Sequence, residues 1–214
     1  MKKYMLLLFA TIYLCISCPA DSLGEANNQI LFHSGSEHFS FKIPTGWQQL
    51  SDTVLKARII ELESQRKTPL AQKPIFAFNR IGAVHPFAVP YLTISAGTLV
   101  INDAEIDKIV NSLPGAMGKA LKQEDVNKLY KDAIIQRPIY DKAKHIATFA
   151  TNSKLDNGVT SLDITLLTAF FFRKDGIVVM AFYLPLNESS TYIPIVKSVM
   201  NSFKFDKEYE YISR

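Results

Sequence analysis

Apolar and polar residues alternate from residue 38 to residue 43, with Phe39, Phe41 and Ile43 on one side. This period of two predicts a half-buried strand, which the turn residues Pro44-Thr45-Gly46 end just before Trp47. Similar alternating or continuous apolar segments predict six more strands, at residues 74–81, 90–100, 133–140, 144–152, 161–173 and 177–184.

Apolar residues at helical spacing predict three helical regions. The first is capped by Ser51 and runs to about residue 65. The second opens with Asn102 and Glu105 as a capping box. We expect Pro114-Gly115 to split or kink this helix, with a second piece at residues 116–121 and a further turn near residues 125–130. The last helix opens at Asn187 or Ser189 and ends at residues 201–203.

Two turn motifs connect the later strands into an antiparallel meander. Asp156-Asn157-Gly158 and Arg173-Lys174-Asp175-Gly176 are hairpin signals, because Asn-Gly and Asp-Gly accept the positive φ angles of tight turns. Residues 165–172 are nearly all apolar, which indicates a central strand covered on both faces. The pattern therefore predicts an α+β fold, a three-layer α/β/α sandwich around a mainly antiparallel sheet.

The start of the chain has the pattern of an export signal. Lys2 and Lys3 precede an apolar run over residues 4–16, which meets the small-residue cluster Ser17-Cys18-Pro19-Ala20. The run is shorter than a membrane-spanning helix requires. We predict a signal peptide at residues 1–20, a flexible tether at 21–29, one domain at 30–206 and a tail at 207–214. The protein is then exported, to the bacterial periplasm or cell envelope.

Two cleavage sites remain open. Cleavage before Cys18 would leave a lipidated cysteine, since Ser17 fits the position before the cut although Cys15 does not fit the upstream one. Cleavage after Ala20 would leave no anchor. In either case the two cysteines, Cys15 and Cys18, form no internal disulfide in the mature chain.

Charge argues against a nucleic-acid partner. Without Lys2 and Lys3 the chain has 22 basic and 20 acidic residues, and the basic ones are scattered along it. Nucleic-acid binding requires a concentrated basic patch. Contact with a membrane is expected only through the lipid anchor.

Three segments together resemble a known family. They are Phe39-Ser40-Phe41-Lys42-Ile43-Pro44-Thr45-Gly46-Trp47, Pro90-Tyr91-Leu92-Thr93-Ile94 and the stretch from Tyr192-Ile193-Pro194-Ile195-Val196 to Ser198-Val199-Met200-Asn201-Ser202-Phe203. This combination is similar to the PsbP-like superfamily, over roughly residues 30–206. The family includes the extrinsic photosystem II protein, a Ran-binding import factor and many bacterial exported proteins of unknown role. The resemblance implies the same α/β/α sandwich and transfers no activity.

A search for catalytic and metal-binding patterns yields no catalytic residue, no metal site and no cofactor. His33 and His38 with Glu37 could meet in a hairpin loop, but polar residues in a turn explain them better. There is no Gly-x-Ser-x-Gly motif; Ser34-Gly35-Ser36 is expected to be a loop, and Ser95-Ala96-Gly97 a strand with a bulge. Trp47 is expected to wedge the sheet edge against the last helix.

Irregular segments on a rigid sheet are the better functional candidates. They are the loop at residues 82–86, with His85 and Pro86, and the helix break at Pro114 and Gly115. These features predict a non-catalytic exported envelope protein that binds a protein partner or a small ligand. The alternatives are a hydrolase with a dispersed site, detectable if His85 or His145 meets a carboxylate and a hydroxyl, and a carrier for an apolar ligand.

Overall fold

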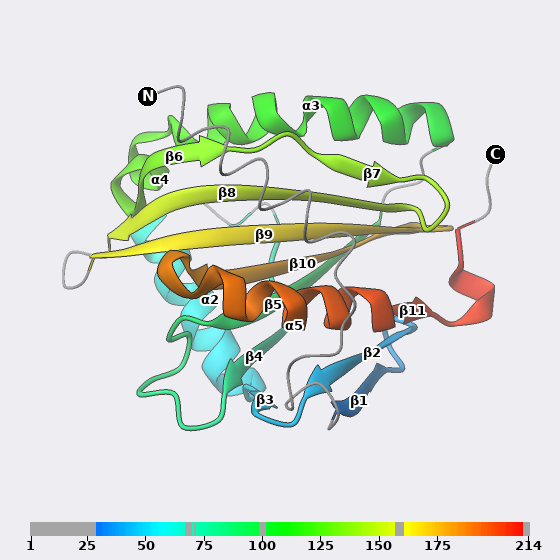
Figure 1. Cartoon of the computed structure of the whole chain (residues 1–214), viewed down its shortest axis with the longest axis horizontal. Helices are drawn as coiled ribbons and strands as arrows, with labels where there is room; N and C mark the ends of the chain where they lie inside the picture. Colours follow the sequence, from blue (N-terminus) through cyan, green and yellow to red (C-terminus); the bar gives the residue numbers. More distant parts are fainter. Residues whose placement is uncertain (1–28, 67–69, 71, 99–101, 157–160, 212–214) are drawn as a thin grey trace.

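The computed structural model describes residues 29–66, 70, 72–98, 102–156 and 161–211. These residues form three layers around a large antiparallel sheet (Figure 1). Helix α5 (Ser189–Ser202) and a small sheet cover one face. Helices α2 (Asp52–Arg66), α3 (Asp103–Leu121) and α4 (Glu124–Leu129) lie on the other. The predicted α/β/α sandwich is confirmed.

The large sheet has eight strands and the small sheet three. The large sheet runs in the order β3 (Trp47–Gln49), β4 (Phe76–Arg80), β5 (Tyr91–Thr98), β10 (Gly176–Pro185), β9 (Ser161–Arg173), β8 (Ile146–Asp156) and β6 (Tyr130–Ile135), with β7 (Ile139–Asp141) also paired to β8. The small sheet runs β1 (Gln29–Ser34), β2 (Phe39–Pro44) and β11 (Lys204–Phe205). A short 3₁₀ helix, η1 (Leu186–Glu188), directly precedes α5. A second one, η2 (Lys207–Tyr209), follows β11.

The central strands bury side chains on both faces, as their apolar sequence predicts. Phe171 of β9 lies in the main core, under α5 and the small sheet, whereas its neighbour Phe172 lies in a second core under α3. In β10, Met180 and Phe182 belong to the main core and Ile177 to the second. Alternation along each strand thus supplies both cores from one sheet.

The expected split of the second helix into two pieces at Pro114 is wrong. Helix α3 runs without interruption from Asp103 to Leu121, with Pro114 inside it. Its first half is fixed by the Asn102–Glu105 capping box and by the buried Ile106 and Val110. Packing therefore offsets the hydrogen bond that proline removes, a cost of about 3 kcal/mol in a helix interior.

Two local expectations also need correction. Strand β5 pairs with β10 in unbroken register through Ser95, Ala96 and Gly97, so there is no bulge. At the β9–β10 turn, Gly176 does not have a positive φ. It faces the backbone of Gly97, and a Cβ at this position would overlap the Gly97 carbonyl oxygen. Close approach of β5 explains glycine here. The turn at residues 157–160 lies outside the described residues.

Candidate functional site

The loop between β4 and β5 is held in place by one buried side chain. Asn79, near the end of β4, is 1% exposed. Its Nδ2 donates to the carbonyl of Ala88, and its Oδ1 accepts from the amide of Phe87, both at 2.8 Å. One carboxamide therefore satisfies two backbone groups of the loop, which would otherwise lack a partner inside the protein.

The base of the loop is tied to the neighbouring corner of the fold. The amide of Ile81 donates to Gly46 O at 2.8 Å, and Arg80 Nη1 donates to Tyr192 OH of α5 at 3.0 Å. The Pro44-Thr45-Gly46 turn and helix α5 thus both help to hold the base of this loop in place.

Aromatic packing fixes the part of the loop that leads into β5, at Phe87. The ring of Phe87 lies edge-on against Tyr91, with ring centroids 5.6 Å apart, and the Arg58 guanidinium lies 5.8 Å from the Phe87 ring centroid. Tyr91 in turn stacks on Tyr183 at 4.2 Å. Burial raises the pKa of Tyr91 well above its usual value, so this phenol stays neutral at physiological pH.

The tip of the loop presents uncharged and apolar groups to solvent. Val84 is 93% exposed and Ile81 58%. The predicted residues His85 and Pro86 are also exposed, and His85 Nδ1 lies 3.0 Å from the Pro86 carbonyl oxygen. A short loop is thus anchored firmly at its base while its largest apolar side chains remain uncovered. That combination is typical of a recognition surface.

Two of the four histidines, His33 and His38, meet away from this loop. His33 and His38 approach the two carboxylate oxygens of Asp206, at 3.6 and 3.4 Å, while Glu37 turns to Arg173. In the part of the chain that the structure describes, no group of three or more His, Cys, Asp or Glu residues is arranged to hold a metal ion. His145 lies 3.4 Å from Tyr140 OH and near Tyr211.

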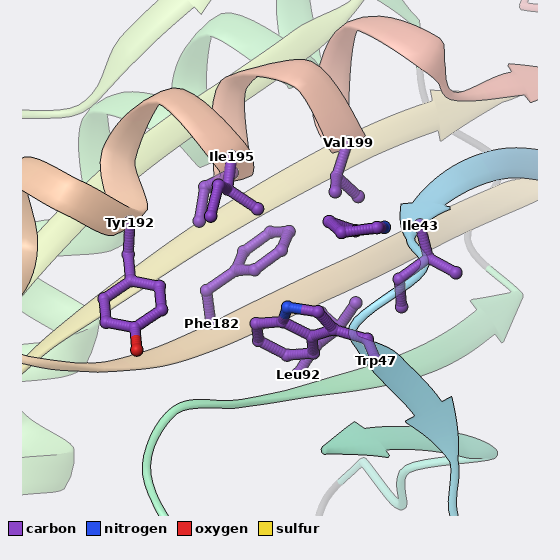
Figure 2. A pocket seen from close by; sticks show the side chains of 9 residues that line it. Ile43, Trp47, Leu92, Phe182, Tyr192, Ile195 and Val199 are labelled. Atoms are coloured by element: carbon purple, nitrogen blue, oxygen red, sulfur yellow. The ribbon is translucent and has the colours of Figure 1, made fainter. Parts of the chain in front are cut away.

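An apolar pocket lies beside Trp47, between the sheet edge and α5. Figure 2 shows the indole of Trp47 below Phe182, with Ile195 and Val199 of the helix above them and the Tyr192 ring to the left. This is the predicted wedge. The cavity offers only about 10 Å³ to the centre of a water molecule, which is room for one water at most. The pocket is a filled core contact, and it gives the carrier alternative no support.

The remaining predicted site residues are separate from the loop. Pro114 and Gly115 lie within α3, on the other side of the sheet from α5, and a Cβ at Gly115 would meet nothing within 4 Å. Cys18 lies outside the described residues. No helix in the described ranges is long and apolar enough to cross a membrane.

Sequence reasoning overlooked Asn79. The signal was present, because Asn79 follows Phe76-Ala77-Phe78 and places a carboxamide at a position of β4 where an apolar residue would be expected. A buried polar side chain near a strand end needs partners, and here the adjoining loop provides them.

Comparison with known proteins found similar chains among solved structures alone. No family model matches the chain, and no curated protein matches it. Among solved structures, cyanobacterial PsbP from Synechocystis sp. PCC 6803 is 8% identical with a TM-score of 0.48, over 88% of this chain and 97% of that one. LpqN, involved in cell envelope biogenesis of Mycobacterium tuberculosis, is 10% identical with a TM-score of 0.47, over 83% of this chain and 90% of that one.

A PsbP protein, from the group that the sequence resembles, is thus one of the structures to which this chain is similar. At such low identity and TM-score the likeness carries no argument about function.

Proposed function

We propose that the protein is a non-catalytic exported envelope protein that binds a protein partner through the β4–β5 loop. The observation that carries the proposal is Val84, an apolar side chain 93% exposed on a loop that Asn79 fixes from below. Burying a valine side chain contributes roughly 1.5–3 kcal/mol, so a pocket on a partner would gain substantially from this residue.

Order in the free protein adds to this gain. The loop's backbone is already bonded to Asn79 and to Gly46, so binding would lose little conformational entropy. Ile81, 58% exposed on the same loop, supplies a second apolar contact. A fixed loop with two uncovered apolar side chains suits a partner whose complementary surface is concave and apolar.

A protein partner fits better than the other ligands considered. A small apolar ligand would need an enclosed apolar cavity. The Trp47 pocket is too small for one, and the larger depression beside Leu162, Asp163 and Asn187 is open to solvent and partly polar. A hydrolase would need His85 or His145 beside a carboxylate and a nucleophile, and the hydrogen bonds of these two histidines involve the Pro86 carbonyl and Tyr140.

The test compares three full-length variants in affinity capture from envelopes of the source organism. Val84→Asp should lose a discrete protein that the wild type retains, and so should Ile81→Asp. The control is Ile134→Asp, because Ile134 is 67% exposed on β6 at the far edge of the sheet. Loss of the same protein from the control, or retention by all variants, would count against the loop. Sedimentation of the wild type, but not Val84→Asp, with phospholipid vesicles would assign the loop to a lipid surface instead.

A further inference from the structure

Building on the proposed function, in which the β4–β5 loop binds a protein partner, we infer that Arg80 pairs with a carboxylate on that partner. Arg80 is the last residue of β4, at the base of the loop, and it is exposed. It lies four positions before Val84 in the chain. The partner's contact surface then combines an apolar pocket for the tip of the loop with an acidic group beside it.

The side chain of Arg80 is held in place from α5. Its Nη1 donates to the hydroxyl of Tyr192 at 3.0 Å, and Tyr192 is 5% exposed. Figure 2 shows the Tyr192 ring extending from the helix, with its oxygen pointing away from it. Arg80 also lies directly opposite Trp47 on β3, so the two side chains leave the sheet on the same face. Because the guanidinium is already positioned, a partner would lose little side-chain entropy in binding it.

The bond to Tyr192 leaves most of the hydrogen-bonding capacity of Arg80 unused. An arginine side chain has five N–H donors, and a neutral phenol oxygen does not offset its charge. Among the described residues, Arg80 forms no ion pair, not even with Glu188, four positions before Tyr192. By contrast, Arg58 pairs with Glu61 at 2.7 Å. Arg80 therefore keeps an uncompensated positive charge at the base of the loop.

The surroundings of Arg80 add no negative charge. The chain has no Asp or Glu at residues 44–50 or 80–90, and Arg80 is the single Lys or Arg in these two segments. The Arg58–Glu61 pair of α2 has no net charge. An acidic group of a partner would thus be attracted to this corner, and a basic group would be repelled.

Arg80 and the tip of the loop are close enough to share one interface. Four residues of chain span at most about 14 Å, which limits the distance between the Cα atoms of Arg80 and Val84. A standard interface buries about 800 Å² on each partner, which corresponds to a disc roughly 30 Å across. A partner centred on Val84 therefore covers Arg80 as well.

A carboxylate is the group that best fits this arginine. The planar guanidinium presents pairs of parallel N–H donors to the two oxygens of a carboxylate. Exclusion of water by the apolar side chains of Ile81 and Val84 would strengthen the pair. A lipid phosphate offers similar oxygens, but binding to an anionic membrane surface needs several neighbouring cations, and these two segments supply one.

The test extends the capture from envelopes of the source organism to charge variants and to salt. The full-length wild type should retain its protein less well as sodium chloride rises from about 50 to about 500 mM. Arg80→Gln should retain roughly tenfold less at low salt and lose most of the salt dependence, and Arg80→Glu should retain still less. Arg80→Lys should be intermediate, because lysine keeps the charge without the planar fork.

The matched control is Arg137→Glu, which changes the net charge by the same amount as Arg80→Glu. Arg137 is exposed in the connection between β6 and β7, at the opposite edge of the sheet from β4, and forms no ion pair within the described residues. This variant should retain the protein as the wild type does.

Two further measurements separate recognition from support of the loop. Tyr192→Phe removes the bond to Arg80 and keeps the charge, so retention should fall less than in Arg80→Gln and still depend on salt. Hydrogen exchange of the Phe87 amide in Arg80→Gln should match the wild type, because Asn79 holds this amide. Faster exchange there, together with lost retention, would overturn the inference, since Arg80 would then only support the loop.

The remaining outcomes distinguish this inference from the proposed function. Full retention by Arg80→Glu, with loss in Val84→Asp, would overturn the role of Arg80 and leave the loop as the binding site. Equal losses in Arg80→Glu and Arg137→Glu would also overturn it. Retention by every variant, Val84→Asp included, or by none and not by the wild type, would count against the proposed function as well. Sedimentation of the wild type, but not Arg80→Glu, with anionic phospholipid vesicles would assign the arginine to a lipid phosphate instead.

Discussion

The carboxamide of Asn79 accepts a hydrogen bond at 2.8 Å from the amide of Phe87, which lies eight positions further along the chain in the β4–β5 loop. The same side chain donates to Ala88, so the shape of the loop depends on a residue in the strand beneath it. Phe87 has a positive φ of 61°, an uncommon conformation for a phenylalanine. The bond to Asn79 helps to hold it there.

Replacing Asn79 by Ala should loosen the loop and weaken the fold. The change leaves the Phe87 amide and the Ala88 carbonyl without their partner, and one unsatisfied buried group costs about 1–3 kcal/mol. Urea unfolding should show a loss of this size, and the Phe87 amide should exchange faster. The control is Gln48→Ala. Gln48 lies on the adjacent strand β3, directly opposite Asn79, and its side chain is exposed. Equal stability of the two variants would show that Asn79 does not support the loop.

Two glycine substitutions should have opposite effects. Ala at position 176 would push a methyl group into the Gly97 carbonyl of β5. Overpacking of this kind costs typically about 1–3 kcal/mol, and more where only backbone can move. Ala at position 115 lies in the interior of α3 with nothing within 4 Å, so it should stabilise the protein by roughly 0.5–1 kcal/mol. Thermal unfolding of both variants gives the comparison, and a Gly176→Ala protein as stable as the wild type would contradict the close approach of β5.

The predictable part of the fold is the part whose side chains repeat regularly. The predicted bounds of β9 match its observed bounds, because this strand is long and apolar on both faces. Asn102 and Glu105 form the capping box that their spacing indicates. Strands β3 and β11 have three and two residues and pair with strands distant in the sequence, so the residues near them carry too little pattern to reveal them. Strand β1 forms a hairpin with β2 and was also not predicted.

The position of the loop at residues 82–86 was predictable, and the way it is anchored was not. Glycine and proline marked the loop that contains His85 and Pro86. The expected break at Pro114 failed because Ile106 and Val110 bury the helix and outweigh the local cost of proline. The role of Asn79 depends on Phe87 and Ala88 folding back over it, which is a tertiary relationship that local spacing does not encode.

Arg173, the last residue of β9, should stabilise the contact between this strand and the turn that joins β1 to β2. Its side chain is 8% exposed, donates to Glu37 O at 2.7 Å and lies 3.0 Å from Asp175 Oδ1. Arg173→Ala should cost about 1–3 kcal/mol in urea unfolding, because the Glu37 carbonyl loses a charged donor. Glu37→Gln keeps that carbonyl and changes only a side chain 3.7 Å away, so it should cost less than about 1 kcal/mol. Equal costs would show that the side-chain ion pair matters more than the backbone contact.

Stability should fall at alkaline pH through Tyr140, Tyr91 and Tyr183, whose side chains are half-buried or buried. Burial, with the carboxylates of α3 and β7, raises the pKa of Tyr140 to about 12. Burial also raises the pKa of Tyr91 and of Tyr183. An unfolded tyrosine has a pKa of about 10, so their contribution is complete below about pH 10 and is lost as pH rises toward the folded values. Urea unfolding across this range should show the decline, and it should be shallower in Tyr140→Phe. An identical pH dependence in that variant would contradict the assignment.

The most direct measurement is photocrosslinking in living cells of the source organism, with a benzophenone amino acid placed at position 84. The account predicts one discrete crosslinked protein from position 84, lost when Ile81→Asp is added. A crosslinker at position 134, where Ile134 is 67% exposed, should not trap it. Absence of any product from position 84, or the same products from both positions, would contradict the claim that the β4–β5 loop recognises a protein partner.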